Sequence, residues 1–101
     1  MAPAESQADG GAGSDAVTLR YWAAARQAAG TAQELYGSAA TLAELLDRAR
    51  AAHRHDGGEL DRVLARCSFL VDGEPVGRRA HAQVSLAAGS VVEVLPPFAG
   101  G

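Results

Sequence analysis

The residues best suited to chemistry are the last six of this chain, Pro96-Pro97-Phe98-Ala99-Gly100-Gly101. The two terminal glycines carry no Cβ, so the free α-carboxylate of Gly101 ends the slimmest and most flexible stretch of backbone. Such a terminus can enter a narrow active site that belongs to another protein. The carboxylate of Gly101 is therefore the candidate reactive group, and the candidate partner-binding residues are Gly100, Ala99, Phe98, Pro97 and Pro96.

The segment before the glycines favours a functional tail over a frayed chain end, although glycine-rich ends are common at frayed termini. The β-branched run at 90–95 predicts a strand. Two prolines then end it, because proline has no N–H to donate to a hydrogen-bond ladder. Phe98 adds, shortly before the glycines, an aromatic side chain large enough to anchor the tail in a partner's pocket. We expect a folded domain at 16–95 and a flexible tail at 96–101.

Two other groups of residues have side chains that can do chemistry. His53, His55 and Asp56 lie in a helix-breaking segment with no further ligand at metal spacing, so we interpret them as a solvated helix end and predict no metal site. Cys67 is the single cysteine and has no histidine near it in the sequence. We predict a buried structural thiol and, because an internal disulfide is impossible, a cytoplasmic protein.

Composition excludes several classes of function. A chain of 101 residues supports one domain, and all nine of its basic residues are arginine, which rules out lysine chemistry. Three of the acidic residues, Glu5, Asp9 and Asp15, lie in the first 15 positions, so the body of the chain is near neutral. This balance gives no basic footprint for nucleic acid. We also expect no membrane association, because the sequence lacks a signal peptide and a long apolar run.

The order of expected elements predicts an α+β fold. Residues 1–15 are expected to form a disordered leader, because they contain too little apolar side chain to offset the entropy of ordering. The clearest signal is a helix at 42–53, where Thr41 and Glu44 form a capping box before leucines at helical spacing. The other expected elements are strands at 16–23, 31–36, 68–71, 74–76 and 90–95, a helical turn at 23–29 ended by Gly30, a short helix at 60–67 and a loop at 78–83. Together they suggest a mixed sheet packed on one face by the main helix, with the strand order left open.

Three segments resemble the ubiquitin-like sulfur carriers of the MoaD/ThiS family, which have the β-grasp fold. Residues 22–30 are similar to the Phe-Ala-x-x-Arg-x-x-x-Gly segment that follows the family's first strand, and residues 71–73 to its Val-Asn-Gly hairpin. Residues 86–101 resemble its ending, Leu-x-x-Gly-Asp-x-Val-x-x-x-Pro-Pro-Val-x-Gly-Gly. The resemblance is strongest to MoaD, the small subunit of molybdopterin synthase. The chain departs from the pattern at Trp22, Ser90 and Phe98, which stand for Phe, Asp and a small aliphatic residue.

The resemblance implies a carrier that is not an enzyme on its own and binds no cofactor. An E1-like adenylating enzyme of the MoeB or ThiF type, using ATP and magnesium, would activate the Gly101 carboxylate, and a sulfur donor would convert it to a thiocarboxylate. The tail would then deliver sulfur to a large subunit of the MoaE type for molybdopterin synthesis. Two alternatives stay open: a sulfur carrier for cysteine or thiamine thiazole synthesis, and a ubiquitin-like protein modifier or plain β-grasp binding module.

Overall fold

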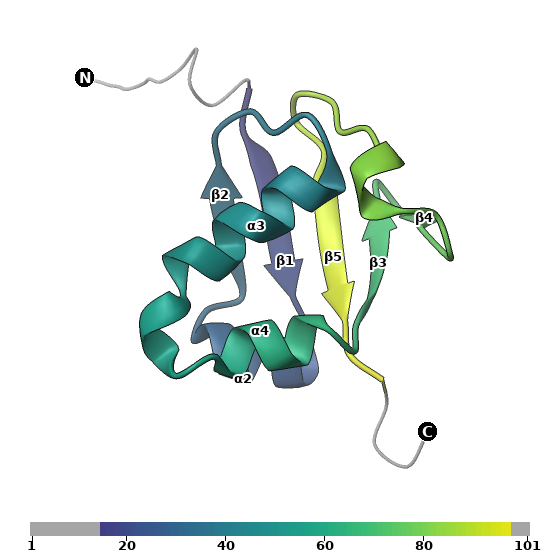
Figure 1. Ribbon diagram of the computed structural model, residues 1–101. Helices are drawn as coiled ribbons and strands as arrows, with labels where there is room; N and C mark the ends of the chain where they lie inside the picture. The colour runs from purple at the N-terminus through teal and green to yellow at the C-terminus, as the bar shows by residue number, and fades with distance from the viewer. Residues whose placement is uncertain (1–14, 98–101) are drawn as a thin grey trace, which may run out of the picture.

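The computed structural model describes residues 15–97, so the expectations for the leader before Asp15 and for Phe98 to Gly101 lie outside the described residues. The described chain has one mixed sheet and several helices (Figure 1). In chain order the elements are β1 (Val17–Tyr21), α2 (Ala23–Ala29), β2 (Gln33–Tyr36), α3 (Leu42–Ala52), the 3₁₀ turn η1 (Arg54–Asp56), α4 (Glu59–Leu64), β3 (Ser68–Val71), β4 (Glu74–Pro75), the 3₁₀ turn η2 (His81–Gln83) and β5 (Val91–Leu95).

The sheet has the strand order β2-β1-β5-β3-β4, which places the last strand of the chain in its centre. β1 and β5 pair in parallel, whereas the other neighbouring strands pair antiparallel. The main helix α3 lies across one face of the sheet (Figure 1). This confirms the expected α+β architecture and supplies the strand order that the sequence left open.

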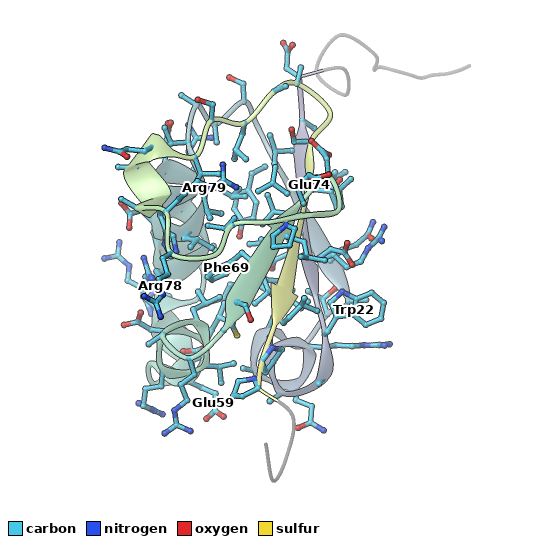
Figure 2. All side chains as sticks on the ribbon, turned by 90° about the vertical axis from the view of Figure 1, so that its right-hand side faces the viewer. Trp22, Glu59, Phe69, Glu74, Arg78 and Arg79 are labelled. Atoms are coloured by element: carbon cyan, nitrogen blue, oxygen red, sulfur yellow. The ribbon has the colours of Figure 1, made fainter. Side chains whose placement is uncertain are left out.

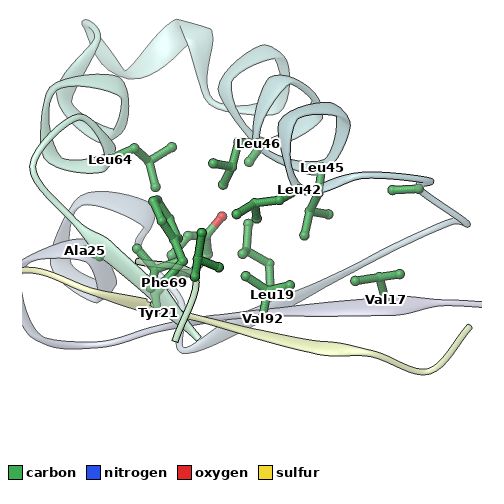
Figure 3. Close-up of a cluster of buried hydrophobic side chains, with 14 of the residues drawn as sticks. Val17, Leu19, Tyr21, Ala25, Leu42, Leu45, Leu46, Leu64, Phe69 and Val92 are labelled. Atoms are coloured by element: carbon green, nitrogen blue, oxygen red, sulfur yellow. The ribbon is translucent and has the colours of Figure 1, made fainter. Parts of the chain in front are cut away.

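The core lies between the sheet and the helices, as the close-up in Figure 3 shows. Alternate residues of β1 and β5 point into it, as the period of two along each strand predicts. The helix α3 adds one apolar stripe at helical spacing. The buried residues of these three elements are Val17, Leu19 and Tyr21 of β1, Val92 and Val94 of β5, and Leu42, Leu45, Leu46 and Ala49 of α3.

Two helix-end features predicted from the sequence are present in the structure, and the structure shows a third that was not predicted. The Thr41 hydroxyl accepts a hydrogen bond from the Glu44 N–H at 3.2 Å, so the predicted cap of α3 is present. Gly30 ends α2 with a φ of 77°, a conformation that glycine adopts without strain. The addition is Asp56, whose carboxylate accepts from the backbone N–H groups of Gly58, Glu59 and Leu60 and thereby caps α4.

Several expected boundaries need correction. The first strand ends at Tyr21, before the expected residue 23, because Ala23 takes a φ of 49° and opens α2. The helix expected at 60–67 begins at Glu59 and ends at Leu64, and the loop expected at 78–83 contains the turn η2.

The start of β5 is fixed by the turn between β3 and β4. The Asp72 carboxylate accepts hydrogen bonds from the Ser90 hydroxyl at 3.1 Å and from the Val91 N–H at 2.9 Å. Ser90, one of the departures from the family pattern, is buried and also accepts from the Ala87 N–H. A short hydroxyl therefore links the hairpin to the central strand.

Candidate functional site

The tail leaves the molecule from the end of its central strand. β5 stops at Leu95, as the two following prolines predicted, and Leu95 is aligned with Ser68 of β3. On the other side Val94 is aligned with Tyr21 of β1, and its carbonyl accepts from the Trp22 N–H at 3.2 Å. Strands therefore pair with β5 on both sides up to the residue before the tail. Gly101 and three of the predicted partner-binding residues (Gly100, Ala99 and Phe98) lie outside the described residues, whereas Pro96 and Pro97 lie at this base.

A groove of about 310 Å³ lies beside Pro96 and Pro97, and we call it the tail-base groove. Its lining combines apolar side chains with three charged ones from the α4 region. The remaining lining residues are Ala24, Glu59, Arg62, Val63 and Arg66. Figure 2 shows Glu59 near the point where the described chain ends.

The charges of the tail-base groove are weakly partnered. Arg62 donates to the Gly57 carbonyl at 3.1 Å and lies 3.8 Å from the Glu59 carboxylate, and both of these charged side chains are largely exposed. Arg66 has no hydrogen bond or ion pair from its side chain to any residue between 15 and 97. The groove therefore carries a net positive charge at the exit of the tail.

The sheet face opposite the core shows partly exposed side chains. Val91, Glu93 and Leu95 alternate with the buried residues of β5 and are all half-buried. Trp22 is 44% exposed, and its ring N–H donates to the Glu93 carboxylate at 3.1 Å. Leu35 of the edge strand β2 is 68% exposed. We call this surface, defined by Leu35, Val91, Trp22, Glu93 and Leu95, the open face.

A polar cluster around Glu34 is the main feature that the sequence did not reveal. The Tyr21 and Tyr36 hydroxyls donate to Glu34 Oε1 at 2.7 and 2.8 Å, and His53 Nε2 lies 2.7 Å from Glu34 Oε2. The His53 ring also packs edge-on against Tyr21. The interpretation of His53 as a solvated helix end is wrong, since its side chain is only 15% exposed. The reason is that β2 brings a carboxylate to the end of α3.

The Glu34 cluster shifts the pKa values of its two tyrosines and its glutamate. Burial raises the pKa of Tyr21, and the neighbouring Glu34 carboxylate raises it further. Burial and the same carboxylate raise the pKa of Tyr36 to about 12. For Glu34, burial alone would raise the pKa, but the hydrogen bonds from Tyr21, Tyr36 and His53 outweigh it and lower the pKa. The cluster is therefore an internally satisfied network that ties β1, β2 and α3 together.

Cys67 is not placed to act as a nucleophile. Its side chain is half-buried, where the sequence led us to expect full burial, because α4 ends at Leu64 and Cys67 lies outside it, in the short connection to β3. The thiol donates to the Val63 carbonyl at 3.2 Å, and burial raises its pKa to about 11. A thiol with so high a pKa stays protonated and unreactive at neutral pH.

Residues 15–97 contain no group of three or more His, Cys, Asp or Glu side chains that could hold a metal ion. None of the helices within this range is long and apolar enough to cross a membrane.

Comparison with known proteins identifies the family. The model of the ThiS family matches residues 19–101, which includes both glycines of the tail. The chain belongs to the ThiS family. Members of the ThiS/MoaD group are carriers and are not catalysts themselves. No curated protein matches the sequence.

Solved structures confirm the β-grasp fold of this ThiS family member. The small archaeal modifier protein 1 of Methanosarcina acetivorans superimposes with a TM-score of 0.69 at 18% identity, over 85% of this chain and 96% of the other. A putative molybdopterin converting factor subunit 1 from Pyrococcus furiosus gives 0.66 at 24% identity, over 82% and 98%. The complex of subunits 1 and 2 of molybdopterin-converting factor from Helicobacter pylori gives 0.58 at 22% identity, over 85% and 99%.

Proposed function

We propose that this chain is a MoaD-type sulfur carrier that supplies sulfur for molybdopterin synthesis. An E1-like adenylating enzyme of the MoeB or ThiF type, with ATP and Mg²⁺, activates the Gly101 carboxylate. A sulfur donor converts the activated carboxyl to a thiocarboxylate, and a large subunit of the MoaE type accepts the tail and its sulfur. Membership of the ThiS family supports the carrier role. The resemblance of residues 86–101 to the ending of MoaD favours this branch, and subunit 1 of molybdopterin-converting factor shares the fold.

The observation that carries the proposal is a di-glycine tail attached to the end of the central strand. The six residues from Pro96 to Gly101 reach at most roughly 20 Å when extended. The active site that uses Gly101 must therefore approach the end of β5. The absence of Cβ atoms near the acyl carbon leaves room for the attacking group. A tail that starts at a paired strand and ends in two residues without side chains can present its terminal carboxylate to the active site of another protein.

The open face is the surface on which we place the adenylating enzyme. Its residues Glu93 and Leu95 belong to the strand that continues into the tail, so an enzyme that draws in Gly101 also covers them. Trp22 lies on the same surface and offers a large amphipathic side chain of the type that anchors interfaces. Exposed Trp22 and Leu35 are then explained as contact residues.

The chemistry takes place at one carbon atom. A Gly101 carboxylate oxygen attacks the α-phosphorus of ATP, and pyrophosphate leaves. Hydrosulfide, or an equivalent sulfur nucleophile, then attacks the acyl carbon, and AMP leaves with the bridging oxygen, so that sulfur replaces one oxygen. Where the donor is a persulfide, the product is an acyl disulfide, and a thiol then cleaves its S–S bond, releases the thiocarboxylate and is itself oxidised to a disulfide with the donor. No side chain of this chain has to act as acid, base or nucleophile in either step.

Intact mass spectrometry tests the carrier role. After incubation with a MoeB-type enzyme, ATP, Mg²⁺ and a sulfur source, the mass of the chain should rise by about 16 Da, the replacement of one oxygen by sulfur through an activated acyl group. A chain lacking Gly101 is the control and should show no change. An unchanged mass of the full chain, or an equal rise without Gly101, would contradict the proposal.

Other pathways are distinguished by the acceptor. Capture of a MoaE-type subunit by the thiocarboxylated chain supports the molybdopterin branch, whereas capture of a thiazole synthase or a cysteine synthase supports the alternatives. The modifier hypothesis is favoured by the likeness in fold to small archaeal modifier protein 1 and predicts Gly101 joined to lysines of other proteins. This chain has no lysine side chain of its own to receive the bond.

A further inference from the structure

The tail-base groove is a surface with the properties of a binding site and no partner within residues 15–97. It combines a half-buried Val63 and the exposed Ala24 with the cations of Arg62 and Arg66, against a single acid, Glu59. An occupant that fits should have one apolar side chain and one negative charge. The carrier mechanism uses only the tail and the open face, so this groove is unexplained by it.

We propose that the tail-base groove binds the chain's own last four residues when no partner holds them. The ring of Phe98 packs against Val63 and Ala24, and the Gly101 carboxylate pairs with Arg66 and Arg62. The groove thus provides a resting position for the reactive terminus. This assignment goes beyond the carrier function and does not depend on it.

The length of the tail supports this occupant over a separate molecule. Pro97 itself lines the groove, and Phe98 is joined directly to it in the chain. The four residues from Phe98 to Gly101, which follow Pro97 directly in the chain, span at most roughly 14 Å. The segment is covalently attached, so its effective concentration is in the millimolar range or above, which makes even weak contacts count.

The charge of the groove and the small side chains of the tail also favour the chain's own terminus as the occupant. The tail ends in a single carboxylate, and the groove has one more cation than acid, with Arg66 unpaired among the described residues. Ala99 and the glycines add almost no side-chain volume, so they allow the chain to turn back from Pro97. Phe98 is the residue at which this chain departs from the family's small aliphatic side chain, and the groove gives its ring an apolar surface to cover.

Docking of this kind is reversible and partial. The Arg62 and Arg66 side chains are exposed, so their attraction for a carboxylate is screened by solvent. At any moment the tail is docked in only a fraction of the molecules. The apparent affinity of a partner for the tail equals its intrinsic affinity multiplied by the fraction of molecules whose tail is free. The groove lowers the exposure of the terminus without blocking activation.

Nuclear magnetic resonance of the full chain at neutral pH and low salt tests the proposal. We expect nuclear Overhauser contacts between the Phe98 ring protons and the Val63 methyl groups. In the variant Arg66→Gln these contacts should fall to about half or less. The matched control is Arg54→Gln, which removes an exposed arginine from η1, outside the groove, and should leave the contacts unchanged.

A second arm removes the other charge. The chain with Gly101 converted to its amide keeps the ring and the arginines and should lose the contacts to the same extent as Arg66→Gln. Absence of the contacts in the unmodified chain, or their persistence at full intensity in both Arg66→Gln and the amide, overturns the proposal. Neither arm uses ATP or a partner enzyme, so failure here leaves the mass-shift test of the carrier function untouched.

Discussion

The Glu34 cluster and the tail-base groove each contain a glutamate among other polar side chains, but they differ in where their hydrogen bonds go. In the cluster, both carboxylate oxygens of Glu34 have partners on three other residues of the same chain. In the groove, the Arg66 side chain has no hydrogen-bond or ion-pair partner within residues 15–97. The Arg62 side chain donates to one backbone carbonyl and lies 3.8 Å from the Glu59 carboxylate. The difference separates charges that hold the fold together from charges that are available to something else. Residue type alone does not make this distinction.

The strongest test of this comparison is to remove one acid from each region. Glu34→Ala should lower the free energy of unfolding by about 3 kcal/mol, because two hydroxyls and one histidine lose their partner. Glu59→Ala, in the groove, should change it by about 0.5 kcal/mol or less, as is usual for an exposed ion pair. Urea denaturation measures both. Equal losses from the two variants would contradict the distinction.

The pH dependence of stability gives a second test. The folded-state pKa of Glu34 is lowered, so the unfolded chain takes up this proton first as the pH falls. The contribution of Glu34 is therefore complete above the unfolded pKa and is lost as the pH falls through the folded one. The difference in stability between the unchanged chain and Glu34→Gln should shrink as the pH falls below the ordinary glutamate pKa of 4.5 and through the lower pKa of folded Glu34. The control is Glu74→Gln, which replaces an exposed glutamate whose side chain makes no hydrogen bond or ion pair within residues 15–97.

Removing one hydroxyl donor should have a smaller effect. Tyr36→Phe keeps the ring but takes away one of two hydrogen bonds to Glu34 Oε1, which should cost about 1 kcal/mol in the free energy of unfolding. Combined with Glu34→Gln, the two losses should be less than additive, because both act on the same network. Strict additivity in a denaturation series would show that Tyr36 and Glu34 are not coupled.

The smallest expected effect is that of Arg66→Gln on stability. An arginine with no partner between residues 15 and 97 should be replaceable within about 0.5 kcal/mol. The thermal midpoint and the urea midpoint should both stay close to those of the unchanged chain. A clear loss would place Arg66 among the residues that hold the fold together and would blur the comparison between the two regions.

Local features were predictable from the sequence because their causes are local. Thr41 and Glu44 marked the start of α3, leucine spacing marked its buried face, and the proline pair marked the end of β5. The contact between Glu34 and His53 was not predictable, since it joins positions 19 apart in the sequence through the packing of β2 against α3. The half-burial of Cys67 was missed because it depends on where α4 ends.

The candidate site divides in the same way. The tail residues and the reactive Gly101 carboxylate came from the sequence alone, and their role in chemistry stays a prediction. The tail-base groove could not be predicted from the sequence, because Ala24, Arg66 and Pro97 belong to three distant segments that only the fold brings together. The spacing of Arg62 and Arg66, four residues apart, was the one local hint that two cations share a side of the chain.

The parallel pairing of β1 with β5 has a mechanical consequence. These are the first and last strands, and they are aligned over four residue pairs from Thr18 and Val91 to Tyr21 and Val94. A pull between the chain's two ends acts along this pair in shear and loads its hydrogen bonds together, whereas peeling would break them one at a time. In the proposed carrier role, a partner that pulls on Gly101 would load β5 along its hydrogen bonds to β1 and would not peel the strand away from one end.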